Sequence, residues 1–186
     1  MTLKPSLDSL PLITLIIGLC TAAPALFALI APSPAAKMFK AFPRSIWPGR
    51  VLAVFCVAWA TVWSAILPFE WCVMARPYYW IIMPVTIGAI WIFTPELLSC
   101  RAFGLLLVLV PTPMLTSAQW SLSAFRFVVI IYAYALAIIG MFYIALPYLL
   151  RDHIAWSFAN PLRTRAVSAA FATLGTTLVI LSFIVF

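Results

Sequence analysis

Six long apolar stretches run along the chain, separated by short segments that hold most of its basic residues and many of its aromatic residues. The stretches cover residues 10–30, 51–69, 78–93, 101–115, 127–150 and 167–186. A helix needs about 20 mostly apolar residues to cross the hydrocarbon core of a bilayer. The fourth stretch is short and carries Pro111 and Pro113 near its end. The pattern predicts an all-α protein with one domain over residues 1–186, a polytopic transmembrane bundle of six spans.

The first stretch could be mistaken for a cleaved secretory signal, because Lys4 precedes it and small residues follow its most apolar part. However, the apolar character continues past Pro24 to Ile30, which is the full width of a membrane. Leu19 stands where a lipoprotein cleavage site before Cys20 would have a small residue. We therefore expect a retained helix.

Composition excludes a water-soluble domain. Hydrophobic residues make up 66% of the 186 positions and charged residues only 8%, and the mean hydropathy is +1.17. A soluble domain has about 45–50% apolar and about 25% charged residues. Because so few charged residues could not cover the surface of a compact soluble protein, we expect lipid to surround the chain.

The basic residues predict the orientation, because lysine and arginine gather in cytoplasmic loops. With six spans and both termini on the outer side, eight basic residues lie inside and three outside. The inner ones are Lys37, Lys40, Arg44, Arg50, Arg101, Arg151, Arg163 and Arg165, and the outer ones are Lys4, Arg76 and Arg126. If the fourth stretch did not cross the membrane, six basic residues would lie inside and five outside, which is hardly a bias. The net charge of +7 thus indicates membrane topology, and no nucleic-acid partner is expected.

Small residues predict how two of the helices pack. Ala133, Ala137 and Gly140 share one face of the fifth span. Ser168, Ala172 and Gly175 repeat the same spacing in the sixth span. Because small residues let two backbones approach closely, we expect these two helices to form an antiparallel pair.

The densest polar cluster is Arg151, Asp152 and His153, followed by Arg163 and Arg165. Arginines can bind a phosphate or a lipid headgroup, and an adjacent Asp–His pair could adjust protonation. The alternative is an ordinary cytoplasmic helix end that obeys the positive-inside rule and binds no specific ligand. The sequence favours this alternative, because headgroup attraction needs no dedicated pocket.

The first inner loop predicts a short interfacial helix over residues 35–42, with Ser33 and Pro34 as its cap and first turn. Met38, Phe39 and Phe42 would then enter the membrane interface. The basic residues of the same region would contact lipid headgroups as interfacial anchors: Lys37, Lys40, Arg44 and Arg50. Membrane lipids are therefore the expected partners, and a soluble docking partner is the alternative.

Nothing in the sequence predicts catalytic residues, a metal site or a cofactor. No charged residue lies near the centre of any predicted span, where charge usually marks function. The hydroxyl residues there are expected to bond to their own helices. None of the four cysteines forms a C-x-x-C pair, and the single histidine has no ligands at metal-binding spacing.

These features favour a non-enzymatic accessory or scaffolding component of the bacterial inner membrane, with other membrane subunits as partners. Two alternatives remain open at this stage. A small transporter or channel would use Pro84, Pro111 and Pro113 to break its helices. An enzyme that modifies lipid headgroups would work at the cytoplasmic surface through Asp152, His153 and the neighbouring arginines.

Overall fold

The computed structural model describes residues 9–66, 70–93, 98–119 and 125–184, and every element in these ranges is helical. The elements are α1 (Ser9–Ile30), α2 (Pro32–Ala41), η1 (Phe42–Arg44), α3 (Ile46–Ile66), α4 (Glu70–Ala75), η2 (Arg76–Tyr78), α5 (Tyr79–Phe93), α6 (Leu98–Leu109), α7 (Pro111–Gln119), α8 (Arg126–Ala145), α9 (Tyr148–Ser157) and α10 (Pro161–Ile184). The predicted all-α class is confirmed.

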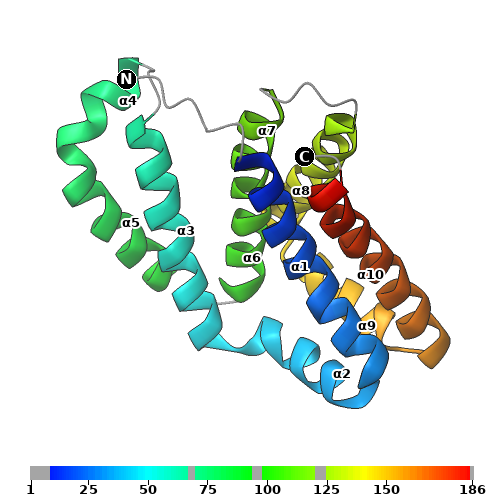
Figure 1. Cartoon of the computed structure of the whole chain (residues 1–186). Coiled ribbons are helices and arrows are strands. Elements are labelled where there is room, and N and C mark those ends of the chain that lie inside the picture. Colours follow the sequence, from blue (N-terminus) through cyan, green and yellow to red (C-terminus); the bar gives the residue numbers. More distant parts are fainter. Residues whose placement is uncertain (1–8, 67–69, 94–97, 120–124, 185–186) are drawn as a thin grey trace.

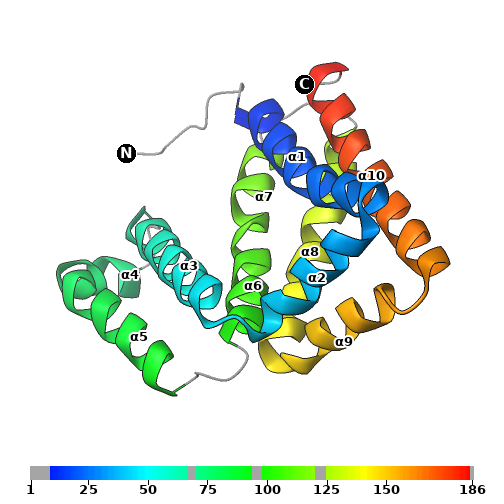
Figure 2. The ribbon, with the colours of Figure 1, turned by 90° about the horizontal axis from the view of Figure 1, so that it is seen from below.

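The long helices alternate in direction along the chain (Figure 1). In this view α1, α5 and α8 run downward, whereas α3, the α6–α7 segment and α10 run upward. Two shorter helices, α2 and α9, lie across the lower end, as the view from below also shows (Figure 2). The first residues of α1 and the last turns of α10 therefore lie at the same end of the bundle.

Five segments are long and apolar enough to cross a membrane: Leu10–Ile30, Ile46–Ile66, Leu98–Gln119, Arg126–Ala145 and Pro161–Phe183. Their side chains are mostly exposed, since the buried share of their most apolar windows lies between 17% and 39%. In water such a surface would be costly, whereas acyl chains solvate it readily. The third predicted span corresponds to α5, which has only 15 residues.

Several prolines of the described residues lie at the start of a helix. Pro48 and Gly49 precede the apolar stretch 51–69, and both lie inside the first turn of α3. Pro32 likewise starts α2 after Ala31, so Ser33 is not the cap of that helix. The reason is that N–H groups in a first helical turn have no partner within the helix, so proline loses nothing there. The predicted short helix exists, but it begins three residues early.

Proline also divides two of the predicted spans. The stretch 127–150 is wrong as one helix, because α8 ends at Ala145 and Pro147 precedes α9. The stretch 101–115 is longer than predicted, since helix resumes at Pro111 and reaches Gln119. The stretch 167–186 begins earlier, at Pro161. Residues 67–69 and 185–186, where the second and sixth predicted spans end, lie outside the described residues.

The predicted pairing of the fifth and sixth spans is wrong. Instead, α10 packs antiparallel along α1, and α8 packs against α6 and α7. The stripe of Ser168, Ala172 and Gly175 is buried, as predicted for a packing face, but it faces α1. A Cβ on Gly175 would lie 2.5 Å from the Ala22 backbone nitrogen, and one on Gly18 would lie 2.8 Å from Val179 Cγ2. Both glycines therefore permit close contact of the two backbones.

The small residues predicted to pack on α8, Ala133, Ala137 and Gly140, lie in two other contacts. A Cβ on Gly140 would lie 2.7 Å from the carbonyl oxygen of Gly104 in α6, and one on Gly104 would lie 2.9 Å from that of Gly140. Ala133 is fully buried in a cluster that joins α8 to α1 and α7, together with Leu10 and Met114. Ala137, between them, is only partly buried. These contacts make a four-part core of α1, α6–α7, α8 and α10.

Helices α3 to α5 form an arm on one side of this core (Figure 1). The buried residues of α3 are Gly49, Ala53, Cys56 and Val57, so its burial ends about halfway along. Gly49 lies against α6, where a Cβ would be 2.7 Å from the Ser99 nitrogen. The Ser99 hydroxyl also donates a hydrogen bond to the Ser45 carbonyl oxygen. The arm is thus attached through the first half of α3.

Candidate functional site

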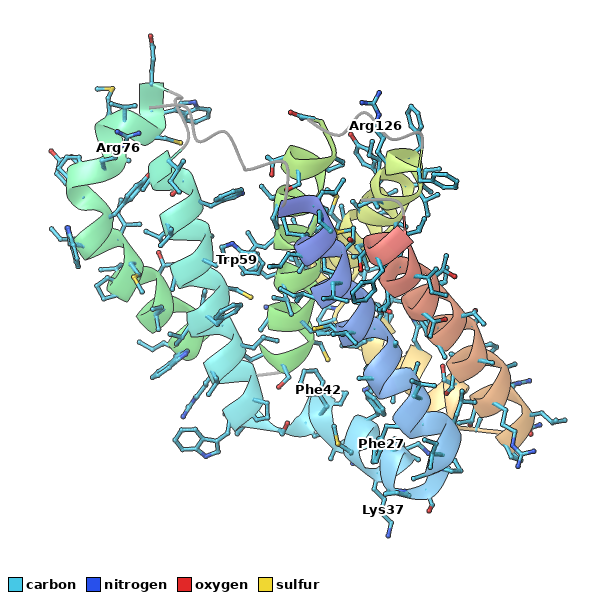
Figure 3. The ribbon with its side chains drawn as sticks, viewed as in Figure 1. Phe27, Lys37, Phe42, Trp59, Arg76 and Arg126 are labelled. Atoms are coloured by element: carbon cyan, nitrogen blue, oxygen red, sulfur yellow. The ribbon has the colours of Figure 1, made fainter. Side chains whose placement is uncertain are left out.

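The basic residues that the sequence assigns to the inner side gather at one end of the bundle, which we call the basic end. Helices α2 and α9 lie across this end, and α3, α6 and α10 begin there (Figures 1 and 2). Its basic residues are Lys37, Lys40, Arg44, Arg50, Arg101, Arg151, Arg163 and Arg165. Figure 3 shows Arg76 and Arg126 at the opposite end of the bundle and Lys37 at the basic end.

Asp152 and His153, which the ligand-binding interpretation treats as a pair, have different partners in the structure. Asp152 Oδ1 accepts a hydrogen bond from Arg151 Nε at 3.0 Å, and both side chains are about half exposed, at 53% and 52%. An ion pair this exposed contributes only about 0–1 kcal/mol. His153 instead contacts Tyr143 of α8, with 3.1 Å between Nδ1 and the phenolic oxygen. The two candidate groups therefore have different partners, and no Asp–His dyad is formed.

A chain of aromatic rings connects the elements of the basic end, and the sequence did not reveal it. Phe42 of η1 packs against Phe103 of α6 at 6.0 Å between ring centroids. Phe103 packs against Tyr143 at 6.5 Å, and Tyr143 packs edge-on against His153 at 5.9 Å. Aromatic pairs at such distances are each worth about 0.5–1.5 kcal/mol beyond the area they bury. His153 is thus part of a packing contact that positions α9.

The corner between α9 and α10 is held by hydrogen bonds and one ring contact. Thr164 is buried, and its hydroxyl group donates to the Ser157 carbonyl oxygen at 2.9 Å. Asn160 Oδ1 accepts a hydrogen bond from the Leu162 amide at 3.1 Å. The Arg163 guanidinium lies 5.2 Å from the centre of the Trp156 ring. Arg163 and Arg165 remain exposed on this fixed corner, so they are available to a ligand.

The predicted interfacial anchors fall into two groups. Lys37, Lys40 and Arg44 are exposed on α2 and η1, where they can contact headgroups. Arg50 is only partly exposed, and its guanidinium lies 5.3 Å from the centre of the Trp91 ring in α5. Arg50 therefore also links α3 to α5, since a cation over an indole ring is attracted to it.

The threonine and serine hydroxyl groups expected to bond to their own helices do so. Thr14 donates to the Leu10 carbonyl oxygen at 2.9 Å, and Thr61 donates to that of Val57 at 2.7 Å. The same local pattern holds for Thr21, Ser64, Thr86, Thr116, Thr173, Thr176, Thr177 and Ser182. Their donor hydrogens are used within the helix, so only their oxygen lone pairs remain for another partner.

Little in the described residues could hold a metal ion. Across residues 9–66, 70–93, 98–119 and 125–184, no three His, Cys, Asp or Glu side chains group together. The four cysteines are free thiols, and Cys56 and Cys100 are fully buried. Cys56 Sγ lies 3.7 Å from the Ala102 carbonyl oxygen, so it contributes to the contact between α3 and α6.

No family of proteins matches the chain, and no match is found among curated proteins or among solved structures.

Proposed function

We propose that the chain is an integral protein of the bacterial inner membrane that crosses the bilayer six times, with both termini outside. We further propose that it works as a non-enzymatic accessory or scaffolding component. Five of the crossings are the long apolar segments described above. The sixth is α5, and the basic end is the cytoplasmic side, which the excess of lysine and arginine there supports.

The position of α5 supports its role as a span. At 1.5 Å per residue its 15 residues are about 22 Å long, which is shorter than a hydrocarbon core of about 30 Å. However, Trp91 near its end contacts Arg50 near the start of α3. Helix α5 therefore runs back along α3 to the basic end, while α4 and η2 remain at the opposite end. A short span is tolerated by local thinning of the bilayer or by snorkelling of flanking residues.

The proposed scaffolding role rests on one observation, namely how the hydroxyl groups within the long helices are bonded. A transporter or an intramembrane enzyme needs polar groups that reach the interior of the bundle and remain available to a substrate. The mid-helix threonine and serine hydroxyl groups named above donate to carbonyl oxygens of the same helix. Ser99 and Thr164, near the starts of α6 and α10, donate to carbonyl oxygens outside their own helices. This arrangement favours packing over transport or catalysis.

The arm provides the surface that a scaffold requires. None of the residues in α4 is buried, and Gly88 of α5 has no atom within 4 Å of the place where its Cβ would be. Small residues on an open helix face allow another transmembrane helix to approach. We therefore assign the exposed face of α5 to contact with a neighbouring membrane protein.

Co-purification tests the proposed role. After extraction in a mild detergent, we expect the chain to migrate with a partner, in a particle larger than its own 20.6 kDa plus detergent. Gly88→Leu should release the partner, because leucine fills the open face of α5. Ala135→Leu, on an exposed position of α8, is the matched control and should not release it. A monodisperse lone monomer in the wild-type extract would count strongly against the proposal.

A further inference from the structure

The basic end carries a shelf made of α2, α9 and the first turns of α10. The two shelf helices are joined by Phe39 and Phe158, whose rings stack at 5.8 Å between centroids. Exposed apolar side chains stand beside the basic ones on this shelf: Met38 is 63% exposed, Trp156 55% and Leu162 73%. This mixture of cations and apolar groups is typical of helices that lie in a membrane interface.

Helix direction adds to the positive charge of this end. Helices α3, α6 and α10 all begin there, and each N-terminus carries a partial positive charge from its unpaired N–H groups. Acidic residues usually occupy such first turns, but α3, α6 and α10 have none. The first turns of α6 and α10 instead hold Arg101 and Arg163, and Arg50 and Arg165 follow directly after the first turns of α3 and α10. Charge and helix dipoles therefore both favour an anion at the basic end.

The acidic groups that the structure describes at this end do not balance that charge. Among the described residues, Asp152 is the only acid at the basic end, and it is bound to Arg151. Glu70 lies in α4 at the other end. Asp152 therefore does not compensate the charge of the exposed basic residues on the shelf, which face solvent or headgroups: Lys37, Lys40, Arg163 and Arg165.

We propose that the shelf binds the phosphate groups of anionic phospholipids, with Lys37, Lys40, Arg163 and Arg165 as its ligands. Lipid is the ligand, in preference to an acidic soluble protein, because Met38, Trp156 and Leu162 lie among the cations and can enter the acyl boundary. This inference rests on the proposed placement in a membrane, but it does not depend on the proposed scaffolding role.

Lipid titration of the purified chain tests the proposal. The protein is placed in nanodiscs of phosphatidylcholine, and phosphatidylglycerol is added while binding is followed by native mass spectrometry. We expect Arg163→Gln/Arg165→Gln, and separately Lys37→Gln/Lys40→Gln, to weaken phosphatidylglycerol binding roughly 30-fold, at about fivefold per basic residue. Arg76→Gln/Arg126→Gln removes the same charge at the opposite end and should change it less than threefold.

Further variants and probes separate the possible outcomes. Arg163→Lys/Arg165→Lys keeps the charge and should restore binding, and circular dichroism in phosphatidylcholine shows whether each variant is folded. Equal weakening by the variants of both ends would overturn the proposal, because it would indicate unspecific attraction. Displacement of phosphatidylglycerol by millimolar inorganic phosphate, or tighter binding of a polyglutamate peptide, would also overturn it in favour of a free anion or an acidic protein. Failure of co-purification would leave this result unchanged.

Discussion

Gly175→Leu is expected to lower the free energy of unfolding by about 3 kcal/mol, the largest effect of any single substitution considered for this chain. A Cβ at this position would lie 2.5 Å from the Ala22 nitrogen and 2.7 Å from Thr21 Oγ1. Two of the three closest atoms belong to the backbone of α1, so no side-chain rotation can make room. The helices must separate along their whole length, and α1 and α10 form the most extensive helix pair of the bundle.

The measurement is denaturant unfolding of the purified protein in mixed micelles, followed by far-ultraviolet circular dichroism. Gly88→Leu, measured like the other variants on the chain separated from any partner, is the matched control, because nothing lies within 4 Å of a Cβ there. Leucine is a better helix former than glycine by about 1 kcal/mol, so the control should be neutral or slightly stabilising. If Gly175→Leu were as stable as Gly88→Leu, the close contact of α1 and α10 would be refuted.

Gly140→Leu is expected to cost about 2–3 kcal/mol, through separation of α8 from α6. The nearest atom to a new Cβ would be the Gly104 carbonyl oxygen at 2.7 Å, followed by Val108 Cγ2 at 2.9 Å. One of these atoms is a side-chain methyl that can shift slightly, so the expected loss is smaller than at Gly175. A gain in helix propensity of about 1 kcal/mol is too small to offset the clash.

The same unfolding experiment measures this loss. Ala135→Leu is the control, because Ala135 is an exposed position on the same helix and leucine there contacts only lipid or detergent. We expect Ala135→Leu to unfold within about 0.5 kcal/mol of the wild type. A comparable loss in both variants would mean that α8 does not pack on α6 through Gly140.

The existence of the helices could be predicted because it depends mainly on local composition. A run of apolar residues about 20 long is sufficient to indicate a helix that leaves its surface to lipid. The helix ends were harder to predict, because proline can start a helix as well as stop one. Pro48 lies inside a first turn of α3, whereas Pro147 separates α8 from α9. Only the position of each proline relative to its helix decides between these roles.

Helix pairing could not be predicted from the stripe of small residues alone. The stripe on α10 could fit any close neighbour, and α1 offers Gly18, Ala22 and Ala25 on one buried face. That second stripe was present in the sequence, and a search of every span for small residues would have found it. The chain of aromatic rings at the basic end is different, because Phe42, Phe103 and Tyr143 are brought together only by the tertiary packing.

If α5 crosses the membrane, the chain has six spans and the basic end lies in the cytoplasm. The test replaces the four native cysteines with alanine and then adds a single Lys37→Cys or Arg126→Cys. An impermeant maleimide is applied to right-side-out spheroplasts, before and after the membrane is opened. We predict that Arg126→Cys is labelled in intact spheroplasts, whereas Lys37→Cys is labelled only after opening. If both cysteines were labelled only after opening, α5 would not cross and the six-span account would be contradicted.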